Sequence, residues 1–224
     1  MSFAVTRGLT WPRGRAASVG VRAQAFTGER VSKVLIVVLF SAMAMRIARD
    51  VAITHHTTGL LLLASEALVV VFTMLRRPAG TVDRSLNARI LTIFSTFAPQ
   101  LVRPASLHPL TPESFTLLLS GIGLILVVLG KVSLGRSFGL APANRGVVST
   151  GVYRFVRHPI YMGYLLTHVG FAIANPIGWN FFILIAADAT LMLRAIREEH
   201  TLALDPEYFG YMQRVRWRIA PGLF

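Results

Sequence analysis

Residues 115–130 read FTLLLSGIGLILVVLG, and residues 59–75 read GLLLLASEALVVVFTML. Both runs approach the roughly 20 apolar residues that a helix needs to cross the hydrocarbon core of a bilayer. The one acid in the second run, Glu66, stands among apolar neighbours, where a charge is costly and normally has a partner or a function. We expect Glu66 to be structural. Runs of this kind predict membrane-spanning helices.

The whole chain shares this apolar character. Of its 224 residues, 54% are hydrophobic and only 15% are charged, whereas an average soluble domain carries about 25% charged residues. We therefore predict an all-α, polytopic transmembrane helical bundle of about six spans, with five to six possible. The predicted spans are residues 31–49, 59–75, 86–102, 115–131, 159–175 and 177–193.

The third predicted span is the weakest of the six. Asn87, Arg89, Pro99 and Gln100 interrupt it, so residues 86–102 either cross the bilayer, lie in its interface or are buried in the bundle. The last two spans are separated only by Asn175 and Pro176, which predict a tight turn between antiparallel helices.

Basic residues gather on alternate loops. Of the 23 Lys and Arg residues, only Arg46, Arg49 and Arg103 fall on the side opposite the others. By the positive-inside rule, both termini and the long fourth loop face the cytoplasm. We predict a multi-pass integral membrane protein, in a bacterial inner membrane, with a cytoplasmic active site. Because the net charge of +13 is spread between apolar runs, it does not indicate nucleic-acid binding.

Three regions follow from this layout: a basic N-terminal arm (1–30), N-terminal transmembrane helices (31–130) and a core (131–224). The arm contains a single acid, Glu29; a cytoplasmic arm near anionic lipid is favoured over a cleaved transit peptide of the same composition. With no cysteine, the chain has no disulfide and no Cys-based metal site, and no metal is expected.

Polar residues concentrate in two segments, 131–161 and 194–224, that the hairpin 159–193 brings together. The first segment contains several glycines, which let the backbone approach a ligand closely. It ends at His158 and Pro159, where a helix begins, and the free N–H groups of a first helical turn make an anion site. These two segments predict a cytoplasmic ligand pocket.

Ionisable residues on the two flanking helices are the candidates for chemistry. Arg194 and Glu198 are four residues apart and share one helix face, so they are either an exposed ion pair or a functional pair at the bilayer surface. For His168 we favour a bond to a neighbouring helix. For Asp188, a contact between packed helices and a place in the cavity wall are equally expected.

The run Gly151–Gly163 (GVYRFVRHPIYMG), Arg194 with Glu198 and Glu199, then Tyr208, Tyr211 and the closing Arg218–Gly222 resemble a known family. They are similar to the isoprenylcysteine carboxyl methyltransferases and their phospholipid methyltransferase relatives, over about residues 131–224. The stretch before Arg145, GRSFGLAPAN, departs from the eukaryotic prenylcysteine enzymes, so the resemblance leaves the acceptor open.

The resemblance implies that the cofactor is S-adenosylmethionine and that the substrate is a lipidic small molecule or a lipidated one in the bilayer. It implies that Arg194 is catalytic and faces the acceptor's carboxylate. It implies that the cofactor is held by Arg145, Gly146, Val147, Val148, Tyr153, His158, Pro159, Ile160, Tyr161 and Glu198.

The implied mechanism is direct in-line transfer of a methyl group. A carboxylate acceptor is already ionised at neutral pH and needs no base, whereas an amine, as in a phospholipid N-methyltransferase, requires one such as His158, Glu199 or Asp188. Two other classes compete. NADPH-dependent membrane sterol or steroid reductases share an Arg-His-x-x-Tyr helix start, but Glu198 and Glu199 would repel a 2′-phosphate. A lipid-binding scaffold or small transporter gives no reason for a glycine-rich loop beside a charged helix end.

Overall fold

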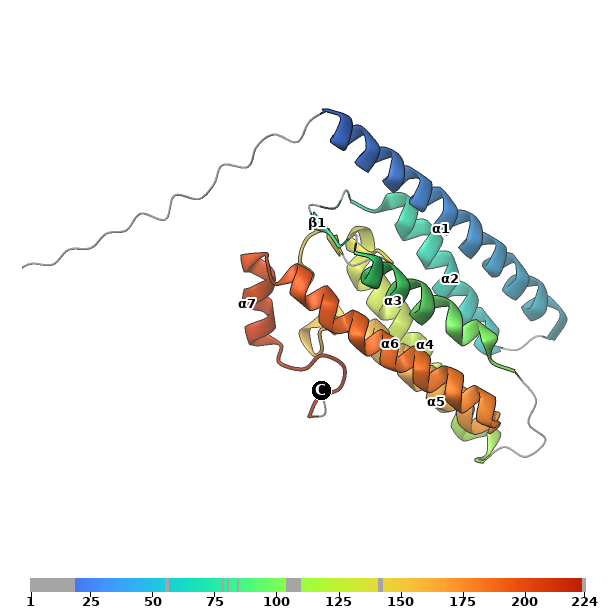
Figure 1. Cartoon of the computed structure of the whole chain (residues 1–224). Helices are drawn as coiled ribbons and strands as arrows, with labels where there is room; N and C mark the ends of the chain where they lie inside the picture. Colours follow the sequence, from blue (N-terminus) through green and yellow to red (C-terminus); the bar gives the residue numbers. More distant parts are fainter. Residues whose placement is uncertain are drawn as a thin grey trace, which may run out of the picture.

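The computed structural model describes residues 19–54, 57–77, 79, 81–83, 85–103, 110–140 and 143–222. Seven helices and three short 3₁₀ turns account for most of this part of the chain (Figure 1). Their bounds are α1 Val19–Thr54, α2 Thr57–Leu75, α3 Leu86–Phe97, η1 Ala98–Leu101, α4 Glu113–Leu134, η2 Gly135–Ser137, η3 Gly151–Arg154, α5 Pro159–Ala174, α6 Gly178–Leu202 and α7 Pro206–Arg214.

Each of the six predicted spans coincides with a helix. The first lies within α1, which begins at Val19 and so includes the end of the predicted basic arm; residues 1–18 of that arm lie outside the described residues. The third is split into α3 and the turn η1, because Pro99 cannot continue the hydrogen bonding of an α-helix. At about 1.5 Å per residue, α3 alone is much shorter than a bilayer's hydrocarbon core.

The prediction of an all-α fold is wrong in one detail. Two short strands, β1 (Thr81–Val82) and β2 (Ala143–Asn144), pair antiparallel, with Thr81 opposite Asn144 and Val82 opposite Ala143. Strands of two residues are too short to show an alternating pattern in the sequence. Their pairing ties the loop after α2 to the glycine-rich loop after α4.

Two helices, α4 and α5, cross at very close range through paired glycines. A Cβ atom added to Gly123 of α4 would lie 2.6 Å from the carbonyl oxygen of Gly163 in α5. On either side of this contact, Gly130 of α4 lies equally close to Ile160 of α5, and Gly170 of α5 lies equally close to Ser120 of α4. Small residues allow close backbone approach in membrane helix pairs, so this crossing forms the centre of the bundle.

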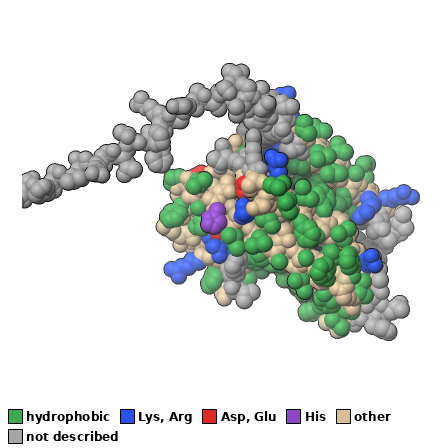
Figure 2. Space-filling view, viewed as in Figure 1, with side chains coloured by type: hydrophobic (Ala, Val, Ile, Leu, Met, Phe, Trp, Pro, Cys, Tyr) green, Lys and Arg blue, Asp and Glu red, His purple; other side chains and the backbone are tan. Residues whose placement is uncertain are grey.

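The face of the bundle seen in Figure 2 is rich in apolar side chains. Large aliphatic and aromatic side chains such as Val34, Leu118, Ile122, Phe182 and Ile185 are exposed, far beyond the scattered apolar residues of a soluble surface. Among the described residues, two helical segments, Glu113–Ser137 and Gly178–Leu202, are long and apolar enough to cross a membrane. The count of six spans stays a prediction.

Different segments of the chain form the two ends of the bundle. The start of α1, the strand β1, the helix α7 and the C-terminus lie toward one end (Figure 1). The turn between α5 and α6 lies at the other, where Asn180 Nδ2 donates to the Asn175 carbonyl at 3.0 Å. The hairpin α5–α6 therefore brings the segment before Pro159 beside the end of α6, as predicted.

Candidate functional site

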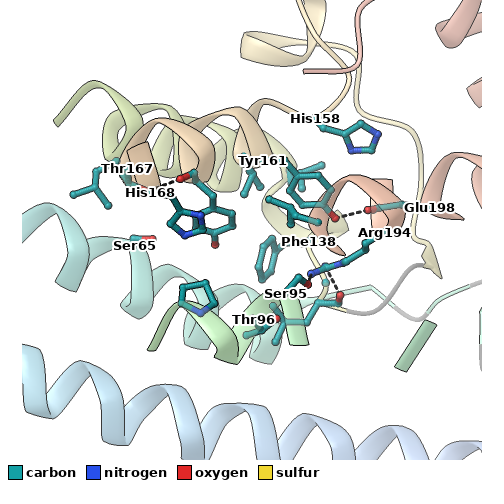
Figure 3. A pocket seen from close by; sticks show the side chains of 18 of the residues that line it. Ser65, Ser95, Thr96, Phe138, His158, Tyr161, Thr167, His168, Arg194 and Glu198 are labelled. Carbon is teal, nitrogen blue, oxygen red and sulfur yellow. Dashed lines mark hydrogen bonds between the residues drawn. The ribbon is translucent and has the colours of Figure 1, made fainter. Parts of the chain in front are cut away.

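A cavity of about 590 Å³ lies inside the bundle, within the range of 300–1,000 Å³ typical of small-molecule sites. Its wall is built from side chains of α1 to α7 and from the loop after α4, and Figure 3 shows some of the lining residues. Ten of the eleven predicted site residues line it: Arg145, Gly146, Val147, Val148, Tyr153, His158, Ile160, Tyr161, Arg194 and Glu198. Pro159 does not line it; it begins α5 at the first turn. The roles assigned to these residues stay predictions.

The loop Arg145–Val148 is held in place from both sides. Asn144 Oδ1 accepts a hydrogen bond from the Gly146 amide at 2.9 Å, and Asn144 Nδ2 donates to Asp205 Oδ2 at 2.7 Å. Gly146 has φ +101°, a conformation that side chains disfavour. Ser137 Oγ donates to the Arg145 carbonyl at 3.1 Å. The loop is therefore fixed before any ligand arrives.

Asp205 joins this loop to α7. Its second oxygen, Oδ1, accepts from the Glu207 amide at 2.9 Å, so the residue caps the N-terminus of α7. The hydrogen bonds from Asn144 and the Glu207 amide lower the pKa of Asp205 below its ordinary value.

Three tyrosines close the same end of the cavity. Tyr211 Oη donates to the Tyr153 carbonyl at 2.7 Å, and the rings of Tyr208 and Tyr211 lie 5.5 Å apart. Burial raises the pKa of Tyr208 and Tyr211 above the ordinary value, so both hydroxyls stay protonated at neutral pH. This end of the cavity offers aromatic faces and neutral donors.

Tyr161 contacts both of the predicted site residues on α6, Arg194 and Glu198. Its hydroxyl donates to Glu198 Oε2 at 2.6 Å, and the Arg194 guanidinium lies 5.4 Å from its ring centroid (Figure 3). The His158 ring stacks on it at 5.0 Å. Arg194 and Glu198 thus share one face of α6, as their spacing predicted, but Tyr161 is the hydrogen-bond partner of Glu198.

Arg194 is buried yet incompletely bonded. Its Nη1 donates to Ser95 Oγ at 3.4 Å and its Nη2 donates to the Leu140 carbonyl, whereas its Nε has no hydrogen-bond partner among the residues that the structure describes. A guanidinium carries five N–H donors and is always charged. Its remaining donors make Arg194 a ready site for an anionic group in the cavity.

Glu199 has a structural position outside the cavity lining. Its side chain is buried and lies 3.3 Å from Arg157 Nη1, 2.8 Å from Arg218 Nε and 3.1 Å from His158 Nε2. Backbone hydrogen bonds reinforce the cluster, because the amides of Arg157 and His158 donate to the carbonyls of Trp217 and Arg218. We call these four side chains the Glu199 cluster. It fastens the C-terminal segment to the start of α5.

The two remaining ionisable candidates form a pair. His168 Nδ1 lies 2.6 Å from Asp188 Oδ1, so His168 bonds to a neighbouring helix as expected. His168 also lines the cavity, while Asp188 is not among the lining residues of the described chain. Glu66, expected to be structural, lines the cavity as well.

Several lining residues were missed from the sequence. Tyr208 and Tyr211 belong to the motif that carried the resemblance, but they received no role. Ser95 and Leu140, the partners of Arg194, lie in segments without a recognisable pattern. Lys131, which is not among the lining residues of the described cavity, was also missed; it donates to Ser65 Oγ at 2.7 Å and to the Ser65 carbonyl at 3.0 Å, and Ser65 lines the cavity. Only the intramembrane placement of Lys131 could have marked it in advance.

Residues 113–204 match the family model described as phospholipid methyltransferase. The chain is also similar to two proteins of Arabidopsis thaliana. It is 35% identical to "Protein-S-isoprenylcysteine O-methyltransferase A" over 85 residues, and the match covers 28% of this chain and 43% of that protein. It is 31% identical to "Protein-S-isoprenylcysteine O-methyltransferase B" over 121 residues, and the match covers 43% of this chain and 57% of that protein.

The chain therefore spans about half the length of the curated relatives it matches. The resemblance inferred from the motifs is confirmed by these matches. The segment that matches the family model contains α4, α5, α6 and all eleven predicted site residues.

Proposed function

We propose that this chain is an integral membrane methyltransferase that uses S-adenosylmethionine to methylate the carboxylate of a lipidic acceptor. The observation that carries the proposal is the placement of Arg194 and Glu198 on one face of α6, lining one cavity, with Tyr161 between them. A cation for an anionic acceptor and an acid for a cofactor are thereby held side by side.

The cofactor would occupy the end of the cavity built from Arg145–Val148, Tyr153 and Glu198. The residues fit this ligand on chemical grounds, because the carboxylate of Glu198 can accept from amino or hydroxyl groups and Tyr208 and Tyr211 supply aromatic faces. S-adenosylmethionine, when bound, supplies an electrophilic methyl group on a sulfonium. The loop needs no rearrangement, because Asn144, Ser137 and Asp205 already fix it.

Arg194 would orient the acceptor. Its buried Nε lacks a partner, so an acceptor carboxylate satisfies it and is drawn toward Tyr161 and Glu198. Arg194 would hold a carboxylate oxygen toward the methyl group that the bound cofactor would supply, and no group of the chain would have to remove a proton. The chain contributes positioning and exclusion of water, which together provide most of the rate in such a transfer.

A carboxylate is a better acceptor here than an amine. An amine must lose a proton, yet each base considered for that step is engaged elsewhere. Glu199 lies against two guanidinium groups, His158 is bonded to Glu199, and Asp188 is bonded to His168. The phospholipid N-methyltransferase alternative is therefore disfavoured.

The reductase alternative also loses support, although for a narrower reason than the sequence suggested. Glu199 is neutralised by Arg157 and Arg218, so of the two adjacent glutamates only Glu198 lines the described cavity. That single acid still lies at the end where a cofactor phosphate would have to sit. The alternation of basic loops supports a cytoplasmic location for this end of the bundle, where the soluble cofactor would be available.

The test separates the two charged residues. Glu198→Ala should abolish binding of S-adenosylhomocysteine to the detergent-purified chain, whereas Arg194→Ala should retain binding and lose methylation of N-acetyl-S-farnesylcysteine. Glu207→Ala, an exposed acid on α7, is the matched control and should change neither property. Normal turnover by the Arg194→Ala protein would show that Arg194 does not orient the acceptor.

A further inference from the structure

Away from Arg194, the cavity meets a second group of polar side chains, which the proposed mechanism does not use. Ser65 and His168 lie on the opposite side of the close-up from Arg194 and Glu198 (Figure 3). We call Ser65, Glu66, Lys131, Tyr164 and His168 the inner polar cluster. All except Lys131 line the cavity. A fully saturated tail would leave these groups without polar contacts.

Lys131 is satisfied by the protein itself. It is completely buried, donates both to Ser65 Oγ and to the Ser65 carbonyl, and lies 5.9 Å from the ring centroid of Tyr164. Its ammonium group is the cation whose charge acts on Glu66. Lys131 thus joins α2 to α4 and is not free to bind a ligand.

Glu66 is not satisfied. The residue is only 7% exposed, and its Oε2 has no hydrogen-bond partner within the described part of the chain. A buried carboxyl oxygen without a donor is costly, and such an atom on a cavity wall is available to a ligand.

His168 offers a second acceptor. Its Nδ1 lies 2.6 Å from the Asp188 carboxylate, which can only accept, so Nδ1 carries the proton. In the neutral tautomer that this bond favours, Nε2 is a hydrogen-bond acceptor. The rings of Tyr164 and His168 are stacked at 6.4 Å, which fixes the orientation of the imidazole.

Two threonine hydroxyl groups on the cavity wall are already paired. Thr116 Oγ1 donates to the Glu113 carbonyl and Thr167 Oγ1 donates to the Tyr164 carbonyl, each at 2.8 Å. These two hydroxyls are therefore less available to a ligand than Glu66 Oε2.

We propose that Glu66 and His168 form a subsite for a hydroxyl group on the chain of the acceptor, separate from the carboxylate that Arg194 orients. This inference rests on the proposed function. With the Glu66 proton on Oε2, a hydroxyl accepts a hydrogen bond from that oxygen and donates its own proton to His168 Nε2, so one hydroxyl pairs with both groups. A hydroxylated lipid acid is then the preferred acceptor, and a plain hydrocarbon chain, as in N-acetyl-S-farnesylcysteine, is used less well because it leaves both groups unpaired.

The experiment measures binding of octadecanoate and of its monohydroxy isomers, with the hydroxyl at successive positions along the chain, to the detergent-purified full chain by calorimetric titration. The wild-type protein should bind one isomer, or two adjacent ones, roughly tenfold more tightly than octadecanoate. Glu66→Leu should remove this preference, because it weakens binding of the hydroxylated probe and strengthens binding of octadecanoate. His168→Phe provides a second variant in case the first does not fold.

Thr73→Val is the matched control. Thr73 is on the same helix, is buried and has an unpaired hydroxyl, but it does not line the cavity; its substitution should leave the preference unchanged. Equal binding of all probes by the wild-type chain, or an undiminished preference in Glu66→Leu, would overturn the subsite. Because these titrations omit the cofactor, a protein that fails to bind S-adenosylhomocysteine can still show the preference, and the two proposals fail separately.

Discussion

Replacing Glu199 by leucine should be among the most destabilising single changes in the chain. Its carboxylate neutralises Arg157, which is itself buried, at 3.3 Å, and it also binds Arg218 and His158. Arg218 is one-third exposed and can be hydrated, but Arg157 would be left as a buried charge whose remaining side-chain hydrogen bond, among the described residues, is to the Arg216 carbonyl at 3.2 Å.

Breaking a buried ion pair by removing one partner costs about 3–5 kcal/mol. In a chain of this size each 1 kcal/mol lowers the melting temperature by roughly 2–4 °C. Glu199→Leu should therefore melt at least about 6 °C below the wild-type protein in a thermal scan in detergent. Because His158 loses its partner, the cavity wall should also loosen and S-adenosylhomocysteine should bind more weakly.

Two further variants make this experiment decisive. Glu207→Leu removes an exposed acid from α7 and should not change the melting temperature. Adding Arg157→Leu to Glu199→Leu removes the stranded charge and should restore part of the lost stability. A Glu199→Leu protein that melts with the wild type, or a double variant less stable than the sum of its single changes, would refute the assignment of the Glu199 cluster as a structural fastening.

Three other changes test separate parts of the structure. Gly123→Ala should destabilise the α4–α5 crossing by about 1–3 kcal/mol in thermal or denaturant unfolding, because its Cβ would lie 2.6 Å from the Gly163 carbonyl oxygen. Gly121→Ala, which has open space around its Cβ, is the control. Equal stability of the two variants would contradict the close crossing of α4 and α5. Tyr161→Phe removes the 2.6 Å hydrogen bond to Glu198 and should weaken binding of S-adenosylhomocysteine by about tenfold, as expected for a hydrogen bond to a charged group. Unchanged affinity would show that Tyr161 does not position Glu198. The lowered pKa of Asp205 means that its stabilisation of α7 is complete above the ordinary value of 3.8 and is lost as the pH falls below it. Amide hydrogen exchange in α7 should therefore rise as Asp205 is protonated in the wild type, but not in Asp205→Asn, which keeps the cap. An identical response to acid in both proteins would exclude Asp205 as the source of the pH dependence.

The helices could be predicted from the sequence because their signal is local. An apolar run such as 115–130 is long enough to be recognised by composition alone, and Pro159 marks the start of α5 by its own covalent geometry. The spacing of Arg194 and Glu198 likewise fixes their common face before any tertiary contact is known. These features do not depend on what lies across the bundle.

Contacts between distant segments could not be predicted in the same way. The sequence suggested that Glu199 was a possible base, and only the fold shows that Arg157, His158 and Arg218 converge on it. The pairing of β1 with β2 involves two residues on each strand, which carry no periodic signal. Glu66 was expected to be structural, but its place on the cavity wall depends on how α2 packs against α4 and α5.

The proposed activity depends most directly on what binds at the end of the cavity formed by Arg145–Val148, Tyr153 and Glu198. Calorimetric titration of the detergent-purified chain with S-adenosylhomocysteine and, separately, with NADPH distinguishes the two cofactors. We expect binding of S-adenosylhomocysteine at micromolar concentration, lost in Glu198→Ala, and no binding of NADPH. Micromolar binding of NADPH without binding of S-adenosylhomocysteine would contradict the methyltransferase assignment.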